Sequence, residues 1–258
     1  MDALLAVLAA SLGFTVGSFL NVCIDRLPRH ESIVTGRSHC DKCGRQLAAR
    51  DLVPVLSYLV LRGRCRTCGV RIPGRIPAVE AATGLVFAGL VLAQGVTLTS
   101  ALLAVYAAIL IVVFVIDLEH GLILNVTVVP ALVFALLVAV LAAPGWLGDL
   151  FPHRVLSAAA GAVAGFALLF LIALLARGGM GWGDVKFAAF MGAATGFPLV
   201  FVALFCSVII GGAAGVILLA TRKKGRKQAM PFGPFLALGT MATLLWGPAM
   251  LAWYVSLM

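Results

Sequence analysis

The stretch LTSALLAVYAAILIVVFVID, residues 98–117, holds nineteen uncharged residues followed by one aspartate. Nineteen residues of α-helix are about as long as the hydrocarbon core of a bilayer is thick, which favours a membrane-spanning helix. An aspartate at the end of such a span lies where the apolar layer meets water. The stretch therefore predicts a membrane protein with a carboxylate at one membrane face.

The composition of the whole chain favours the same class. The 258 residues are 62% hydrophobic and only 11% charged, a surplus of apolar surface that a soluble domain of this length could not bury. Apolar windows near the spanning length lie at residues 3–23, 78–95, 98–116, 123–143, 155–176, 185–197, 199–220 and 235–256. We predict an all-α polytopic membrane protein with about eight transmembrane helices, or seven if the short sixth window only dips into the membrane.

The basic residues predict the orientation in the membrane. The segment 24–77 holds eleven Lys and Arg, the regions of Arg177 and Lys186 add two, and 221–234 adds five, which leaves only Arg154 on the other side. The positive-inside rule places the larger group in the cytoplasm. Because the N-terminus lacks a basic region before its apolar run, we expect a retained first span and not a cleaved signal.

This topology divides the chain into a first transmembrane helix (1–23), a cytoplasmic loop (24–77) and a transmembrane domain (78–258). The net charge of +9 follows from the orientation and adds an attraction to anionic membrane lipids. No basic stripe is interleaved with aromatic residues, so nucleic acid is not an expected partner.

Two matching cysteine motifs stand in the cytoplasmic loop. CDKCG (40–44) and CRTCG (65–69) give the pattern C-x2-C, twenty-one residues, C-x2-C. Two such turns supply four sulfur ligands for a tetrahedral zinc ion, from Cys40, Cys43, Cys65 and Cys68. Two disulfides or two redox dithiols are the alternatives, but a reducing compartment and a small core favour structural zinc. A closed tetrathiolate site would shape the loop and would not itself hydrolyse a substrate.

A second aspartate follows a run of alternating glycines. In GMGWGDVKF (179–187) three glycines precede Asp184, which begins the sixth window. The third span runs inward and the sixth outward, so Asp117 and Asp184 both fall at cytoplasmic helix ends and could face each other. Two facing carboxylates cannot both ionise cheaply, so one stays protonated while the other acts as a base. This is the chemistry of an aspartyl protease, which needs no metal or cofactor.

The glycines fit this hypothesis. Gly181 and Gly183 would let an extended substrate backbone come close to Asp184, while non-helical chain at this depth lines a wet cavity. Asp184 would sit in the first turn of the next helix, where the macrodipole favours its ionised form. For either aspartate alone, an interfacial or capping role is an equal alternative. Both together with the glycine run favour catalysis.

Four further polar residues are candidate contacts for a substrate or cofactor. Asn21 and Asp25 lie one helical turn apart in GSFLNVCIDRLPR (17–29), where a packing role is the alternative. Glu80 begins the second span and needs a partner, either an arginine of the cysteine loop or a substrate amine, with structural pairing preferred. Lys186 follows Asp184 by two residues.

Six blocks in order resemble the type IV prepilin peptidase family of bifunctional leader peptidases and N-methyltransferases. They are GSFLNVCIDRLPR (17–29), the paired cysteine motifs, IPAVEAATG (76–84), FVIDLEHGLILN (114–125), GMGWGDVKF (179–187) and PFGPFLALG (231–239). GWGD (181–184) matches the glycine-x-glycine-aspartate signature shared with presenilin-like proteases. Leu124 departs from the family, many of whose members have proline there.

The resemblance implies that Asp117 and Asp184 are the catalytic aspartates. They would cut the short basic leader from prepilins or pseudopilins after a glycine, at the cytoplasmic face of the bacterial inner membrane. The enzyme would then methylate the new N-terminal residue, often phenylalanine, using S-adenosylmethionine. The cysteine loop is associated in the family with metal binding and with the methylating half.

Three other classes remain as alternatives. A cation-coupled transporter would explain acids near the membrane, but these acids lie at one face and not at the midplane. A scaffold displaying a zinc module leaves the glycine run without a purpose. A presenilin-like protease without methylation leaves the cysteine loop unexplained.

Overall fold

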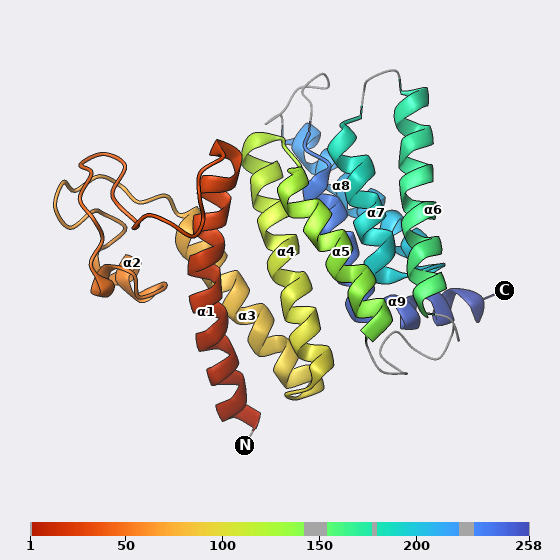
Figure 1. The fold of residues 1–258 in the computed structure, drawn as a ribbon, viewed down its shortest axis with the longest axis horizontal. Coiled ribbons are helices and arrows are strands. Elements are labelled where there is room, and N and C mark those ends of the chain that lie inside the picture. Colours follow the sequence, from red (N-terminus) through yellow and green to blue (C-terminus); the bar gives the residue numbers. More distant parts are fainter. Residues whose placement is uncertain (1, 142–153, 177–179, 222–229, 258) are drawn as a thin grey trace. The chain divides into compact units, whose positions relative to one another are not determined.

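The computed structural model describes residues 2–141, 154–176, 180–221 and 230–257. Within these ranges the chain is helical and contains no β-strand, only two isolated bridges, which confirms the predicted all-α class (Figure 1). The chain forms two compact units, Met1–Val112 and Val113–Met258. Gly179, Arg177 and all five basic residues of the predicted segment 221–234 lie outside the described residues.

A helix coincides with each of the eight predicted windows. These helices are α1 (Asp2–Arg26), α3 (Arg75–Gln94), α4 (Leu98–His120), α5 (Asn125–Leu141), α6 (Arg154–Leu175), α7 (Trp182–Thr195), α8 (Leu199–Ala220) and α9 (Gly233–Val255). Six of them are long and apolar enough to cross a membrane, as expected of a multi-pass membrane protein. Helix α5 is apolar but shorter, and α7 has only 14 residues, so eight spans remain a prediction.

The first unit is organised around the packing of α1 against α3 (Figure 1). The two backbones touch at glycines: a Cβ on Gly17 would lie 2.7 Å from the Cα of Glu80, and one on Gly13 would lie 2.7 Å from the Cα of Gly84. Small residues permit such close helix pairs within membranes. This contact sets the register in which residues of the two helices face each other.

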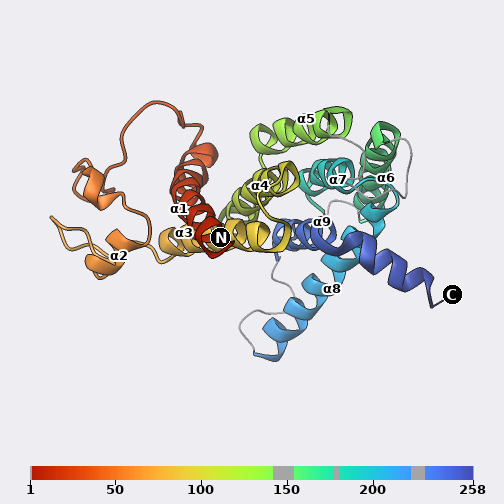
Figure 2. The same cartoon turned by 90° about the horizontal axis from the view of Figure 1, so that it is seen from below.

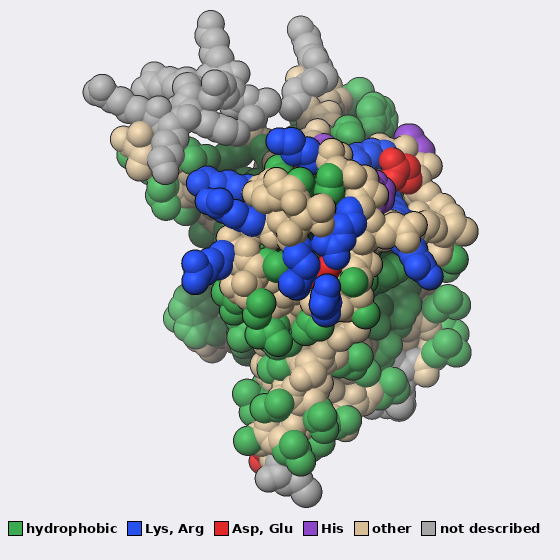
Figure 3. Space-filling model, turned by 90° about the vertical axis from the view of Figure 1, so that its left-hand side faces the viewer, with side chains coloured by type: hydrophobic (Ala, Val, Ile, Leu, Met, Phe, Trp, Pro, Cys, Tyr) green, Lys and Arg blue, Asp and Glu red, His purple; other side chains and the backbone are tan. Residues whose placement is uncertain are grey.

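The segment between α1 and α3 is mostly irregular. It contains two single-turn 3-10 helices, η1 (Leu27–Arg29) and η2 (Ala49–Asp51), and the short helix α2 (Leu56–Val60). Its eleven Lys and Arg, counted over residues 24–77, give it a basic surface, and blue side chains gather over it in Figure 3. At the start of the segment the Arg26 guanidinium donates to the carbonyls of Ser32 and Thr35, at 2.9 and 2.7 Å.

The second unit is built around α7, which contacts α5, α6, α8 and α9. Figure 2 shows α7 between α5 and α9. All residues of α7 from Phe190 to Thr195 are buried, and Gly161 of α6 packs directly on the backbone of Gly192. A helix surrounded in this way holds its first turn, which carries Asp184, in a defined position.

Candidate active site and metal centre

Asp117 lies in the last turn of α4 and is only 5% exposed. Its Oδ2 accepts a hydrogen bond of 2.8 Å from the backbone N–H of Gly233, the first residue of α9. A Cβ on Gly233 would stand 2.6 Å from the same oxygen, so no other residue fits here without displacing the carboxylate. A buried carboxylate held by a backbone donor has a fixed orientation, as an acid–base group requires.

Asp184 occupies the first turn of α7, as expected from the sequence. Gly181 is the N-cap of that helix, and the Asp184 backbone N–H donates to the Gly181 carbonyl at 3.1 Å. A side chain on Gly181 would approach Asp184 Oδ2 to 3.2 Å. Because Gly181 has no side chain, nothing from this position covers the Asp184 carboxylate.

Ile123, in the turn between α4 and α5, lies against a glycine next to each aspartate site, Gly183 and Gly233. A Cβ on Gly183 would lie 2.7 Å from the Ile123 Cβ, and a Cβ on Gly233 would lie 3.0 Å from the Ile123 Cδ1. The turn is thus wedged between the starts of α7 and α9. Ile123 thus lies against Gly183, the neighbour of Asp184, and against Gly233, which binds Asp117.

Lys186 forms its side-chain hydrogen bond with Asn125 and not with either aspartate. Its Nζ donates to the Asn125 side-chain oxygen at 3.0 Å, and this contact joins the first turns of α7 and α5. The contact holds the start of α7 against the start of α5 and so steadies the turn that bears Asp184. Sequence reasoning did not single out Gly233, Ile123 or Asn125, because their contacts depend on how distant helices meet.

The four motif cysteines come together in the first unit. Their sulfur atoms all lie within 4.8 Å of one another, and they form the one cluster of potential metal ligands among the described residues. The distance between Cys40 Sγ and Cys68 Sγ is 3.8 Å. The edge of a tetrahedron with metal–sulfur bonds of about 2.3 Å is also about 3.8 Å. The donor set and its spacing fit one tetrahedrally bound metal ion.

The two cysteine motifs have the same backbone structure. In the first, Cys40 N–H donates to Arg45 O and Gly44 N–H to Cys40 O; in the second, Cys65 N–H donates to Val70 O and Gly69 N–H to Cys65 O. Gly44 and Gly69 have φ of 67° and 68°, a conformation that glycine adopts without strain. The repeat explains why each motif ends in glycine and why the two present their sulfurs alike.

Within the cluster, the pKa of Cys65 is lowered while that of Cys68 is raised by burial and by the neighbouring thiols. Backbone N–H groups of Cys68 and Thr67 point at the Cys65 sulfur and lower the pKa of this thiol from 9.0 to about 6. The Asp51 carboxylate accepts hydrogen bonds from Arg45, which directly follows the first motif, at 3.1 Å and from Arg66 of the second motif at 2.9 Å. Asp51 therefore ties the two motifs together in the arrangement that a shared metal ion needs.

The remaining candidate residues also lie in the first unit. Asn21 and Glu80 are each 5% exposed, whereas Asp25 is more exposed and forms an ion pair with Arg75 of α3. Glu80 accepts a hydrogen bond of 2.7 Å from the backbone N–H of Val55, so the cysteine loop does supply a partner, but a neutral one. Asn21 and Asp25, one turn apart, thus have separate environments.

Comparison with known proteins gives a consistent result along the whole chain. Residues 11–94 match the model of the bacterial peptidase A24 N-terminal domain, and residues 104–216 match that of the type IV leader peptidase family. A prepilin leader peptidase/N-methyltransferase of Bacillus subtilis (strain 168) is 34% identical over 248 residues, covering 95% of this chain and 96% of the relative.

Proteins of the same description from two other bacteria are similar. The one from Pseudomonas putida is 33% identical over 93% of this chain and 90% of its own. The one from Pseudomonas aeruginosa is 31% identical over 92% of this chain and 88% of its own. No solved structure showed significant similarity.

Proposed function

Because the chain belongs to the type IV leader peptidase family, we propose that it removes the leader from prepilins or pseudopilins and then N-methylates the new N-terminal residue. The family and the names of its relatives support both activities. The observation that supports the proteolytic half is that Asp117 and Asp184 both lie beside glycine-containing helix starts that pack against Ile123.

Hydrolysis follows from the roles of these two carboxyl groups. The ionised carboxylate takes a proton from a water molecule, whose oxygen forms the new bond to the scissile carbonyl carbon. The protonated carboxyl group gives its proton to the departing amine as the C–N bond breaks, so one water is consumed and the pair keeps one proton overall. The Gly233 N–H holds Asp117 in place, and Gly181 and Gly183 leave room for an extended substrate backbone.

The proposed location of this chemistry is the cytoplasmic face of the bacterial inner membrane. The basic loop supports this orientation through the positive-inside rule, and Asp117 and Asp184 lie at the ends of helices that would meet that face. A substrate whose leader lies in the cytoplasm would then present its cleavage site at this membrane face. Membrane lipids would surround the apolar helices of the protein.

The cysteine cluster is proposed to hold structural zinc through Cys40, Cys43, Cys65 and Cys68. A tetrathiolate site has no open position, so its contribution is to fold the basic loop. Methylation requires a methyl donor, and S-adenosylmethionine supplies the methyl group when bound. The first unit, which carries the zinc loop, is the proposed place of this second activity.

One experiment tests both activities. The purified protein in lipid is incubated with a prepilin that carries its leader, with and without S-adenosylmethionine, and the N-terminus of the product is read by mass spectrometry. We expect a leader-free product that gains one methyl group only with the donor. A leader-free product that is never methylated would remove the second activity. An intact prepilin, with both proteins shown to be folded, would contradict the proposal.

A further inference from the structure

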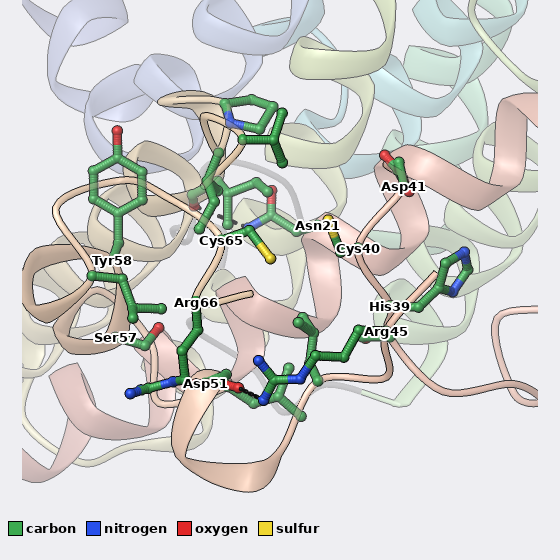
Figure 4. A pocket seen from close by; sticks show the side chains of 18 of the residues that line it. Asn21, His39, Cys40, Asp41, Arg45, Asp51, Ser57, Tyr58, Cys65 and Arg66 are labelled. Atoms are coloured by element: carbon green, nitrogen blue, oxygen red, sulfur yellow. Dashed lines mark hydrogen bonds and ion pairs between the residues drawn. The ribbon is translucent and has the colours of Figure 1, made fainter. Parts of the chain in front are cut away.

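A cavity of about 410 Å³ opens inside the first unit, between α1, α3 and the cysteine loop (Figure 4). Asn21 reaches into it from α1 on the side of Cys40 and Cys65, while Asp51 with Arg45 and Arg66 lines another part of its wall. This volume is within the usual range of small-ligand sites. What the cavity can bind depends on which of its polar atoms still lack a partner.

The Asn21 side chain leaves an acceptor in the cavity. Its Nδ2 donates to two backbone carbonyls, those of Gly17 at 3.2 Å and Ile76 at 3.0 Å. Only an NH2 group can satisfy two carbonyls, so these bonds fix the orientation of the amide. The Oδ1 atom is then left buried and without a hydrogen-bond partner in the described structure. A buried acceptor of this kind costs free energy unless a ligand satisfies it.

Glu80 provides the second acceptor and the only charge of the pair. One carboxylate oxygen accepts the Val55 N–H, while no ion pair of Glu80 occurs among the described residues. Val55 itself has φ of 59°, an unfavourable conformation for a β-branched residue, and the hydrogen bond that its N–H donates to Glu80 holds it. A carboxylate that is 5% exposed and faces only a neutral donor is poorly compensated.

The register of α1 and α3 places these two acceptors together. Gly17 packs on the Cα of Glu80, and Asn21, one turn further along α1, bonds to Ile76, one turn earlier on α3. The antiparallel contact therefore sets the Asn21 amide and the Glu80 carboxylate on facing sides of the same helix pair. Both residues line the cavity.

Four basic residues line the cavity, Lys42, Arg45, Arg66 and Arg71. Arg45 and Arg66 both bind Asp51, and no ion pair joins Lys42 or Arg71 to Glu80 among the described residues. On the side formed by α1 and α3, Asn21 and Glu80 offer a neutral acceptor and a negative charge, and the complementary ligand group is a positively charged hydrogen-bond donor. A metal ion is a poor fit, since one carboxylate and one amide supply too few ligands.

We propose that this cavity binds a primary ammonium group, which donates hydrogen bonds to Asn21 Oδ1 and to the Glu80 carboxylate. The inference rests on the proposed methylation, which involves two molecules with such a group: the new N-terminus of the cut substrate and the amino-acid end of S-adenosylmethionine. Asn21 and Glu80 would orient one of these two ammonium groups.

Binding measurements on the purified full-length protein separate the two sources. The first pair of probes is a short peptide with a free N-terminal phenylalanine and the same peptide N-acetylated. The second pair is S-adenosylhomocysteine and its analogue without the α-amino group. Each probe is titrated calorimetrically into the unmodified protein and into Glu80→Gln, with Glu31→Gln, an exposed glutamate of the same unit, as the matched control.

We expect one free amine to bind better than its capped or deaminated counterpart, and Glu80→Gln to weaken that amine by about 10- to 100-fold, as for loss of a charge-assisted hydrogen bond. Glu31→Gln should bind it normally. If Glu80→Gln weakens binding of the peptide alone, the bound group is the substrate N-terminus. If it weakens binding of S-adenosylhomocysteine alone, the bound group is the amino-acid end of the methyl donor. Equal binding of both members of each pair, or unchanged binding by Glu80→Gln, would overturn the inference.

Two controls keep this result separate from other failures. Glu80→Gln should retain its metal content and its helicity, which shows that the variant is folded. If Glu80→Gln loses its metal, the titrations are repeated with Asn21→Ser, which removes Oδ1 and leaves the contact between Glu80 and Val55 intact. We expect Asn21→Ser to weaken binding of the free amine in the same way. Absence of prepilin cleavage by the unmodified protein would count against the proposed function, whereas the amine titrations are read independently of it.

Discussion

The cysteine loop and the aspartate site hold their functional atoms in different ways. In the loop, four sulfurs are positioned by two short turns and by polar bonds such as those of Asp51 with Arg45 and Arg66. At the aspartate site, Asp117 and Asp184 are positioned by helices in tight contact, with glycines where a side chain would collide. The loop has little apolar core and would gain stability from a bound metal ion, whereas the helices are held by their packing.

Because of this difference, we expect the two sites to be sensitive to different substitutions. A closed metal site contributes folding free energy directly, so its loss affects the loop first. A site built on packed helices is sensitive to added volume, because interiors are close-packed and yield little. Substitutions in one unit should therefore affect mainly the activity of that unit, and the following changes test this separation.

The largest expected effect comes from Asp117→Asn and Asp184→Asn. An amide keeps the shape of the carboxyl group but cannot exchange its proton, so each variant should lose prepilin cleavage by about 10²- to 10⁴-fold or more. Cleavage is measured by mass spectrometry of the product, and circular dichroism checks helicity. Full activity of either folded variant would refute the two-carboxylate mechanism.

Gly233→Ala should have the next largest effect on cleavage. The new methyl group would stand 2.6 Å from Asp117 Oδ2 and must displace the carboxylate or α9. Overpacking of this kind costs about 1–3 kcal/mol, so we expect cleavage to fall by about 10- to 100-fold. Gly212→Ala in α8 is the matched control, since no atom lies within 4 Å of its added methyl. Equal rates for the two variants would show that Gly233 does not position Asp117.

Cys40→Ser should affect the loop more than the aspartates. We expect it to lose nearly all bound zinc and to expose the loop to added protease, with a smaller loss of prepilin cleavage than for either aspartate variant. Metal analysis and limited proteolysis are the measurements, with Cys206→Ser, outside the cluster, as control. If the unmodified protein contained no zinc, the structural-metal proposal would be wrong.

Asp51→Asn should have the smallest effect of the series. Arg66 and Arg45 lower the pKa of Asp51, so their ion pairs contribute fully above the ordinary aspartate pKa of about 4 and are lost only as pH falls below it. At neutral pH we expect the loop of Asp51→Asn to be cleaved by added protease about two- to fivefold faster. Asp41→Asn, which changes an exposed loop carboxylate, should not differ from the unmodified protein, and a matching increase there would remove the specific role of Asp51.

Much of this architecture could be predicted from residue patterns. The apolar windows located every long helix to within a few residues, because spanning length and hydrophobicity are local properties of the chain. The cysteine motifs likewise predicted the cluster, since each C-x2-C turn closes on itself. The sixth window began later than α7, whose first turn includes the polar residues Gly183 and Asp184.

Other parts of the sites could not be predicted in this way. The bond from Gly233 to Asp117 and the wedge of Ile123 arise where segments far apart in the chain meet. The same holds for Glu80. The sequence suggests an arginine of the cysteine loop or a substrate amine as its partner, whereas in the structure the backbone N–H of Val55 donates to it. No local pattern encodes such contacts, because they follow from the register of packed helices and from the path of an irregular loop.

The most direct test of the separation uses the Asp117→Asn/Asp184→Asn double variant with two substrates in parallel. One is a prepilin with its leader, and the other is the same pilin already lacking it, with S-adenosylmethionine present. We predict that the double variant leaves the first substrate uncut and methylates the second at the rate of the unmodified protein. Cleavage of the first substrate, or loss of methylation of the second by a folded variant, would contradict this account.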